Sequence, residues 1–388
     1  MTQLENALTY LERHQKEMMG LWETVVRLET PSGDTAAVDR LASHLDTYCN
    51  ALGMETTLFH PEGAGSCLAA RTQEGPHAPV LLLGHMDTVH PVGSFPGGVF
   101  TLRDGCVYGP GVHDCKGGLV IALYVIRALQ HAGYDRRQLR LVLVGDEETA
   151  HTLSAKQSVE FLQEQSAGCA AAFTFESGLP GGDVVTRRKG GGIMKLRVEG
   201  IASHAGTAPE KGASAVLEAA RKVVAIHEMS DPRHVTYNCG IIHGGTSANV
   251  VPDHCEVSVA LRFHTNQECA DALERLNALC DRVETPGTHC TLGPLVGFPA
   301  MEETPRTEAL FQVYRQASAA LGLGEPGTVF SAGCSDSAYT ASMGIPTLCA
   351  VGVLGEGQHS PNEHAFPDSL LTQAKRLAAA ILALPEEF

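Results

Sequence analysis

The stretch VLLLGHMDTV, residues 80–89, decides the fold that this chain is expected to adopt. Its apolar run is short and ends at a glycine, which is typical of a buried strand in a sheet covered on both faces. Residues 139–145 and 170–175 have the same character, and residues 117–132 are expected to form a helix with a broad apolar face. This alternation predicts an α/β domain with a mostly parallel sheet and helices on both faces.

The pattern changes after the glycine triplet Gly190–Gly192, which we interpret as a hinge. The next segments have the order β-α-β-β-α-β of a ferredoxin-like domain: strand 193–199, helix 212–228, strands 234–242 and 254–263, helix 267–283 and a strand near 290–296. An α/β pattern then returns, with a strand at 345–353 and a helix at 369–384. We therefore expect a large domain of residues 1–190 and 300–388, into which a smaller domain of residues 191–299 is inserted.

Composition narrows the function classes. A chain of 388 residues favours two domains, and 28 basic against 44 acidic side chains give a formal net charge of -16. An acidic surface repels phosphate backbones and anionic lipids, so nucleic acid and membranes are not expected partners. There is no long apolar run and no signal-peptide pattern, and the 12 cysteines form no CxxC pair. These features predict a cytoplasmic protein.

A histidine and an aspartate stand at the end of the deciding stretch. His85 and Asp87 are two positions apart, so on a strand their side chains point the same way. The carboxylate can then accept a hydrogen bond from one imidazole nitrogen and leave the other for a metal ion. Taken alone, the pair also fits two polar groups that satisfy each other at the surface.

Carboxylates and one histidine occupy four further loops. Asp114 lies in a glycine-rich segment just before the predicted helix, where it could also be a simple N-cap. Glu147 and Glu148 follow one apolar strand and Glu176 follows another, while His359 lies between the last strand and the last helix. We expect all these motifs at the C-terminal ends of strands, where open α/β sheets bind ligands. Nitrogen and oxygen donors without cysteine suit Zn²⁺, with Co²⁺ or Mn²⁺ as possible substitutes.

The order of these motifs resembles the zinc carboxypeptidase and aminoacylase family. Relatives in that family include the carboxypeptidase G type, acetylornithine deacetylase and succinyl-diaminopimelate desuccinylase. The resemblance runs from the Thr30-Pro31-Ser32-Gly33 turn to the C-terminal helix. It implies that the large domain is catalytic and binds two Zn²⁺ ions, and that the inserted domain is a lid and dimerisation domain.

The resemblance also implies roles for individual residues. His85 and Glu176 would each bind one metal ion, Glu148 and His359 would complete the two sites, and Asp114 would bridge them. Glu147 would be the general base, and Asp87 would orient His85. The peptide bond between Asp114 and Cys115 is expected to be cis. His359 matches the His-Ser/Lys-x-x-Glu pattern of the family, whereas His364 does not, and we expect no role for His364 in metal binding.

Lid positions that contact substrate in the family are matched by Asn249 and Arg262, and Gly333 matches a glycine loop beside the substrate. Arg262 is the candidate for holding a substrate carboxylate. His204 would stabilise the charge on the carbonyl oxygen, and related dimers imply that it acts on the metal centre of a partner subunit. Phe298 stands where glutamate-selective relatives have arginine, which argues against a preference for glutamate.

The predicted function is the hydrolysis of an amide bond, which releases an amino acid from a small peptide or an N-acyl conjugate, as in a carboxypeptidase. One alternative is an N-acyl-amino-acid deacylase, because it would share the metal ligands and the base. Another is a catalytically silent metal-binding protein, but the presence of Glu147 argues against it, because metal binding alone needs no base.

Six remaining histidines are expected at the surface or behind the metal ligands: His90, His113, His151, His227, His243 and His289.

Overall fold

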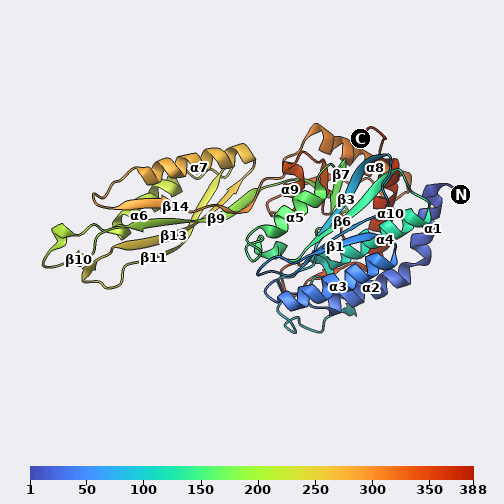
Figure 1. Ribbon diagram of the computed structural model, residues 1–388, viewed down its shortest axis with the longest axis horizontal. Coiled ribbons are helices and arrows are strands. Elements are labelled where there is room, and N and C mark those ends of the chain that lie inside the picture. Colours follow the sequence, from blue (N-terminus) through green and yellow to red (C-terminus); the bar gives the residue numbers. More distant parts are fainter. The chain divides into compact units, whose positions relative to one another are not determined.

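The computed structural model describes residues 1–388, which divide into two compact units (Figure 1). The larger unit holds residues 1–187, 302–331 and 335–388, and the smaller holds residues 188–301 and 332–334. The assignment of the two units to catalysis and to a lid stays a prediction at this point. None of the helices combines the length and the apolar character that crossing a bilayer requires.

The larger unit is built on one sheet of eight strands, in the order β1-β2-β6-β3-β7-β17-β8-β16. Their bounds, in that order, are Glu55–Phe59, Cys67–Arg71, Arg137–Val144, His77–His85, Ala171–Thr174, Thr347–Cys349, Val184–Arg188 and Thr328–Ser331. The four central strands β6, β3, β7 and β17 run parallel, and β1, β2 and β8 pair antiparallel at the flanks. The predicted α/β class with a mostly parallel sheet is confirmed.

Helices cover both faces of this sheet, as β3 shows. Val80 and Leu82 belong to the large apolar core, whereas the alternate residues Leu81 and Leu83 lie outside that cluster and are just as fully buried. Because successive side chains of a strand point to opposite faces, both faces are covered. The helices of the unit are α1 Gln3–Arg13, α2 Gln15–Arg27, α3 Thr35–Ala51, α4 Gly117–His131, α5 Gln157–Ser166, α8 Pro305–Ala320, α9 Ser337–Ser342 and α10 Pro367–Ala383. The predicted helix at residues 117–132 is confirmed by α4.

A second, small sheet has the order β18-β19-β5-β4, with bounds Gly355–Glu356, His364–Ala365, Cys106–Tyr108 and Thr101–Arg103. Its strand β19 pairs with β5 through His364 and Tyr108. The loop between β18 and β19 contains His359, and the segment after β5 leads to Asp114. The small sheet therefore brings these two loops together, although they are far apart in the sequence.

The smaller unit has an antiparallel sheet in the order β11-β13-β9-β14, with two helices that contact each other. Its elements are β9 Gly190–Glu199, β10 Ser203–His204, α6 Ala215–Glu228, β11 Thr236–Gly244, β12 Val250–Val251, β13 His254–Phe263, α7 Asn266–Asp281, β14 His289–Leu292 and β15 Val296–Phe298 (Figure 1). The order of its main elements is the predicted β-α-β-β-α-β.

The glycine triplet, where we predict a hinge, lies in a strand next to the boundary between the two units. Gly190, Gly191 and Gly192 form the first residues of β9 and pair with β13. A Cβ at Gly190 would lie 2.0 Å from the ring of Phe263, and one at Gly191 would lie 2.2 Å from the guanidinium of Arg262. Close packing explains these two glycines, and a sequence pattern cannot distinguish that cause from flexibility.

Candidate metal centre

His85 is the last residue of β3, and its buried ring lies between two aspartates. Its Nδ1 is 3.0 Å from the backbone oxygen of Asp87 and its Nε2 is 3.2 Å from Oδ1 of Asp114. The carboxylate of Asp87 lies farther from Nδ1, at 3.5 Å. A ring that donates from Nδ1 to a carbonyl leaves Nε2 available to a metal ion. In this structure the backbone oxygen of Asp87 is therefore the nearer of the two groups that could orient His85.

Asp114 lies in the short kinked segment Val112–Lys116 directly before α4, and its own backbone is not helical, with φ -115° and ψ 94°. The peptide bond from Asp114 to Cys115 is cis, which confirms the expectation for this bond. The backbone N–H groups of His113 and Asp114 both donate to Oε1 of Glu363 at 3.0 Å. Because Glu363 belongs to the same loop as His359, this carboxylate joins the two loops that the small sheet brings together.

Three other predicted ligands complete the cluster. Glu148 follows β6 and Glu176 follows β7, and these two strands lie on either side of β3. Nε2 of His359 lies 3.0 Å from Oε2 of Glu148 and 3.4 Å from Oδ2 of Asp114. Glu176 accepts a 2.9 Å hydrogen bond from the hydroxyl of Ser335.

The side chains form two groups that could each hold a metal ion. One consists of His85, Asp114 and Glu176, and the other of Asp114, Glu148 and His359, with the ligand atoms of each group within 4.8 Å of one another. Asp114 belongs to both groups. Oε1 of Glu148 is buried and has no hydrogen-bond partner, which is costly unless a cation satisfies it. The donor set, nitrogen and oxygen without sulfur, therefore fits divalent ions such as Zn²⁺.

The charges in this cluster perturb one another strongly. Burial, and next the charge of Glu176, raise the pKa of Glu147 well above its usual range. Burial also raises the pKa of Glu148, to about 7. Burial would raise the pKa of Asp114 too, but hydrogen bonds with His359 and His85 hold it well below its usual range. Hydrogen bonds to Asp114 and Glu148 raise the pKa of His359 to about 10. Such crowding of buried acids is typical of functional sites.

One expectation about this site is wrong. Only the motifs at His85, Glu147–Glu148 and Glu176 follow parallel strands of the large sheet. Asp114 precedes a helix, and His359 lies in a two-strand turn of the small sheet. The small strands are only two or three residues long, so they leave almost no periodic signal in the sequence.

The predicted substrate-binding residues belong to the smaller unit. His204 is exposed in β10, and its Nδ1 accepts hydrogen bonds from the backbone N–H groups of Gly206 and Thr207 at 3.1 Å. Asn249 accepts from the hydroxyl of Ser247 at 2.6 Å. Arg262 donates to the backbone oxygen of Leu261, and the backbone oxygen of Gly333 accepts from Arg188 at 3.1 Å. Because these residues lie in a separate unit, their roles stay predictions.

Among the histidines set aside, two lie behind the cluster and one is fully enclosed. Nε2 of His90 contacts Glu363 at 2.8 Å, and Nε2 of His113 contacts the backbone oxygen of Gly178 at 2.9 Å. His227, His243 and His289 are exposed, as expected. His151 is fully buried between two aspartates.

Sequence reasoning assigned no part in the cluster to Glu363 or Ser335, which contact it from other segments. Glu363 stands four residues after His359, and this spacing was the only local signal for it. His364, treated as a bystander, stacks on Tyr108 with ring centroids 5.0 Å apart, and it belongs to neither group of possible ligands.

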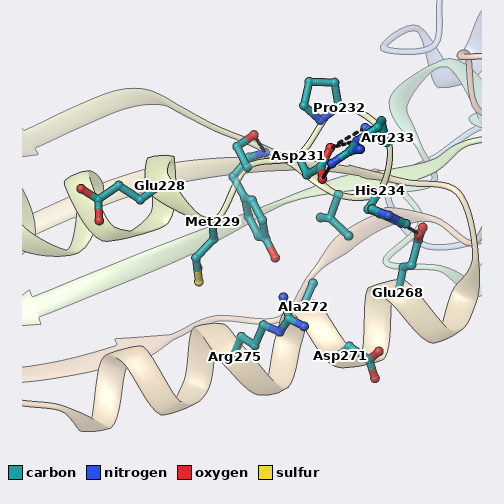
Figure 2. Close-up of a pocket in the computed structure, with 13 residues that line it drawn as sticks. Glu228, Met229, Asp231, Pro232, Arg233, His234, Glu268, Asp271, Ala272 and Arg275 are labelled. Atoms are coloured by element: carbon teal, nitrogen blue, oxygen red, sulfur yellow. Dashed lines mark hydrogen bonds and ion pairs between the residues drawn. The ribbon is translucent and has the colours of Figure 1, made fainter.

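The smaller unit contains a depression of about 620 Å³ between the end of α6 and the start of α7 (Figure 2). Its charged side chains mostly pair with one another, Arg233 with Asp231 at 2.9 Å and His234 with Glu268 at 2.8 Å. This depression therefore lacks the converging acids that distinguish the cluster around Asp114.

Comparison with known proteins agrees with this geometry. The family model described as Peptidase family M20/M25/M40 matches residues 81–383. Carboxypeptidase G2 from Pseudomonas sp. (strain RS-16) is 24% identical over 368 residues, which are 93% of this chain and 87% of the relative. A succinyl-diaminopimelate desuccinylase from Methylobacillus flagellatus is 27% identical over 363 residues, or 88% of this chain and 92% of the relative.

Solved structures share the fold. A tripeptidase from Staphylococcus aureus superposes with a TM-score of 0.74 at 21% identity, covering 95% of this chain and 98% of the other. An M20 family metallo-carboxypeptidase from Sulfolobus solfataricus gives the same TM-score at 16% identity, covering 95% of this chain and 99% of the other.

Proposed function

The chain belongs to peptidase family M20/M25/M40, and on that premise we propose that it is a dizinc-type hydrolase that releases an amino acid from a small peptide or an N-acyl conjugate. It is an enzyme, a metal-dependent carboxypeptidase or amidohydrolase, as the hydrolases among its relatives indicate. This sets aside the silent metal-binding protein. The observation that carries the finer proposal is that two groups of possible ligands share Asp114.

His85, Asp114 and Glu176 would hold one metal ion, and Asp114, Glu148 and His359 the other. When bound, the ions supply positive charge that polarises the amide carbonyl and makes water more acidic. The carboxylates of both groups are largely buried, so they are held in place by their surroundings before any ion arrives.

Glu147 is the proposed general base. Its backbone N–H donates to Asp87 at 3.1 Å, which fixes the turn that carries it. Its carboxylate would take a proton from the attacking water and pass it to the departing amine nitrogen.

The smaller unit would supply groups that recognise the substrate. Since Nδ1 of His204 accepts two backbone hydrogen bonds, its Nε2 carries the proton in the neutral ring and is free to donate. Such a donor suits the oxygen that becomes negative when the amide is attacked. Arg262 is proposed to hold a substrate carboxylate, with Asn249 and Gly333 beside it.

We also propose a homodimer formed through the smaller unit. Strand β11 pairs only with β13, so its other edge is open to a second chain. Ile241 and Ile242 on this strand are 54% and 50% exposed, and Leu217 and Val224 on the adjoining helix α6 are 46% and 58% exposed. Open strand edges and exposed apolar side chains on neighbouring elements are typical of an interface between copies.

The test is a hydrolysis screen of the purified enzyme, stripped with a chelator and reloaded with Zn²⁺, Co²⁺ or Mn²⁺. Dipeptides, N-acyl-glutamates and N-acyl aromatic amino acids distinguish a peptidase from the alternative deacylase. We expect turnover only in the reloaded samples. A lack of turnover on every amide substrate would contradict the proposal.

Glu147→Gln is the matched control in that screen. The amide keeps the size of the side chain but cannot accept the proton, so turnover should fall by roughly 10²–10⁴ while the metal content stays unchanged. Turnover within a few-fold of the parent enzyme would exclude Glu147 as the base.

A further inference from the structure

His151 is a buried ionisable residue that the proposed mechanism does not use. It lies three residues after Glu148, and none of its side chain is exposed. Its Nδ1 is 3.0 Å from Oδ1 of Asp146 and its Nε2 is 2.6 Å from Oδ1 of Asp336, and both aspartates are buried. A neutral imidazole has one N–H group, so it cannot donate to two carboxylates at once, whereas an imidazolium can.

The charges around the ring are consistent with the imidazolium form. Burial would lower the pKa of His151, but the charge of Asp336 and the hydrogen bond with Asp146 raise it to about 9. The other charged groups near this pair of aspartates are Lys156 and Glu147. One positive ring between two carboxylates leaves a net charge of -1, which the positive charge of Lys156 nearby offsets.

The ring joins two segments that hold the metal centre. Asp146 immediately precedes Glu147 and Glu148, and its Oδ2 also accepts from the backbone N–H of Ser154 at 3.0 Å. Asp336 stands at the start of α9, next to Ser335, whose hydroxyl donates to Glu176. A continuous chain of contacts thus runs from the turn that carries Glu147 to Glu176, a candidate metal ligand that follows β7.

The segment that follows the base has a strained backbone. Ala150, His151, Ala155 and Lys156 have φ angles of 53°, 56°, 49° and 72°, in a region that side chains with a Cβ disfavour. Nζ of Lys156 donates to the backbone oxygen of Ala150 at 2.9 Å and to the hydroxyl of Tyr339 at 2.8 Å. Helix α9 therefore holds the segment at two points, through Asp336 and through Tyr339. Such strain persists only where surrounding contacts enforce it.

We propose that His151 is a positioning residue, whose ring clamps the Glu147–Glu148 turn to α9 by bridging Asp146 and Asp336. The clamp holds the Glu147 carboxylate where proton transfer requires it, and a displacement of about 1 Å can cost 10²-fold in rate. This inference rests on the proposed role of Glu147 as the base.

The test compares variants at both ends of the bridge. In His151→Ala and Asp336→Ala the bridge is broken, and we expect kcat to fall by roughly 10–10²-fold with KM changed less than about threefold. In Asp336→Asn the amide can donate to Nε2 while Nδ1–H donates to Asp146, so the bridge persists with a neutral ring. This conservative variant should recover kcat to within about fivefold of the parent enzyme.

Two measurements separate positioning from a loss of stability. Val159→Ala removes buried methyl groups from nearby α5, where Val159 is 6% exposed, and should lower the melting temperature without lowering kcat. In a double-mutant cycle, His151→Gln should have almost no further effect on kcat in a Glu147→Gln background, because the clamp acts through Glu147.

The outcomes are distinct. Equal losses of kcat from His151→Gln in both backgrounds, or a kcat of His151→Ala near that of the parent, would overturn the inference. If His151→Ala does not fold, the Asp336→Ala and Asp336→Asn pair decides, and equal kcat values for that pair would overturn it as well. The proposed function fails separately, when the metal-loaded parent enzyme turns over none of the amide substrates.

Discussion

Asp87 shows how much a single carboxylate can organise at the scale of one residue. It is fully buried, and its oxygens accept from the backbone N–H groups of Glu147 and Glu148 at 3.1 Å and from the hydroxyl of Ser32 at 2.6 Å. A buried carboxylate must be satisfied in this way, because an unpaired charge in the interior is very costly. Asp87 therefore fixes the turn that carries the proposed base Glu147. This role goes beyond the predicted orientation of His85.

The shared position of Asp114 leads to a prediction about metal content. Glu176→Gln removes charge from one group of possible ligands, so each chain should retain one tightly bound ion. Asp114→Asn weakens both groups, and the chain should retain none after dialysis. Metal analysis of dialysed protein measures this, with the exposed Glu164→Gln as control. Two ions of unchanged affinity in Glu176→Gln would contradict the assignment.

The buried ring of His151 predicts how stability depends on pH. Its pKa is raised from 6.5 to about 9 in the folded protein, chiefly by Asp336 against the effect of burial. A raised pKa means that the stabilisation is complete below about pH 6.5 and is lost as the pH rises through about 9. It amounts to on the order of 3 kcal/mol at most.

Denaturant unfolding of the parent enzyme and Asp336→Asn at pH 6 and at pH 9.5 tests this dependence. The stability advantage of the parent over the variant should be larger at pH 6, because most of the positive charge on His151 is lost at the higher pH. An advantage that is the same at both pH values would show that the ring does not titrate in this range.

At the scale of elements, two glycines decide how closely α4 approaches the sheet. A Cβ at Gly118 would lie 2.6 Å from the Cβ and the backbone oxygen of Phe175, and one at Gly117 would lie 2.6 Å from the side chain of Val353. The start of α4 is thus in direct contact with the segment that leads to Glu176. Since Asp114 is only a few residues before this point, the same contact brings the two carboxylates together.

Gly118→Ala should therefore destabilise the enzyme by about 1–3 kcal/mol through overpacking and should weaken metal binding. Gly20→Ala is the matched control, because Gly20 is an exposed glycine in helix α2 with no atom within 4 Å of an added Cβ. That change should instead stabilise the protein by about 0.5–1 kcal/mol, since alanine favours a helix. Thermal unfolding and metal analysis measure both, and effects of the same sign would contradict this account.

At the scale of the whole molecule, each unit has its own apolar core, so each can carry a separate task. The metal-ligand candidates belong to the larger unit, whereas His204 and Arg262 belong to the smaller one. If a dimer forms through β11 and α6, a histidine on one chain can serve the centre of another.

A dimer that shares His204 predicts complementation. His204→Ala and Glu147→Gln subunits should each be nearly inactive, but a mixture of the two should regain activity, because a heterodimer has one site with both groups. Activity of mixed, reassembled subunits measures this. No recovery in heterodimers confirmed by mass would mean that His204 acts within its own chain or not at all.

The interface has its own control. Ile242→Lys should yield monomers in sedimentation experiments, because a buried charge opposes pairing at the edge of β11. Leu102→Lys alters a side chain that is 69% exposed in the larger unit and should leave the assembly unchanged.

The sequence by itself determined the class of the fold and the kinds of donor atoms. Apolar runs of strand length alternate with a helix-length apolar segment at residues 117–132, and this local periodicity follows from side-chain burial alone. Polar residues directly after such runs, at His85, Glu148 and Glu176, were recognisable for the same reason.

Only the tertiary structure decided how the remaining groups meet. Asp114 and His359 come together through strands of two or three residues, and Glu363 holds the Asp114 backbone from 249 residues away. The sequence predicts a hinge at residues 190–192 and does not reveal their close packing, because a missing Cβ looks the same in a sequence whether it serves flexibility or close packing. The sequence assigns no role to His151, because its two partners are 5 and 185 residues away and only folding places both beside one ring. Contacts between distant segments depend on the packing of the whole unit, and short-range sequence patterns do not predict which distant segments pack together.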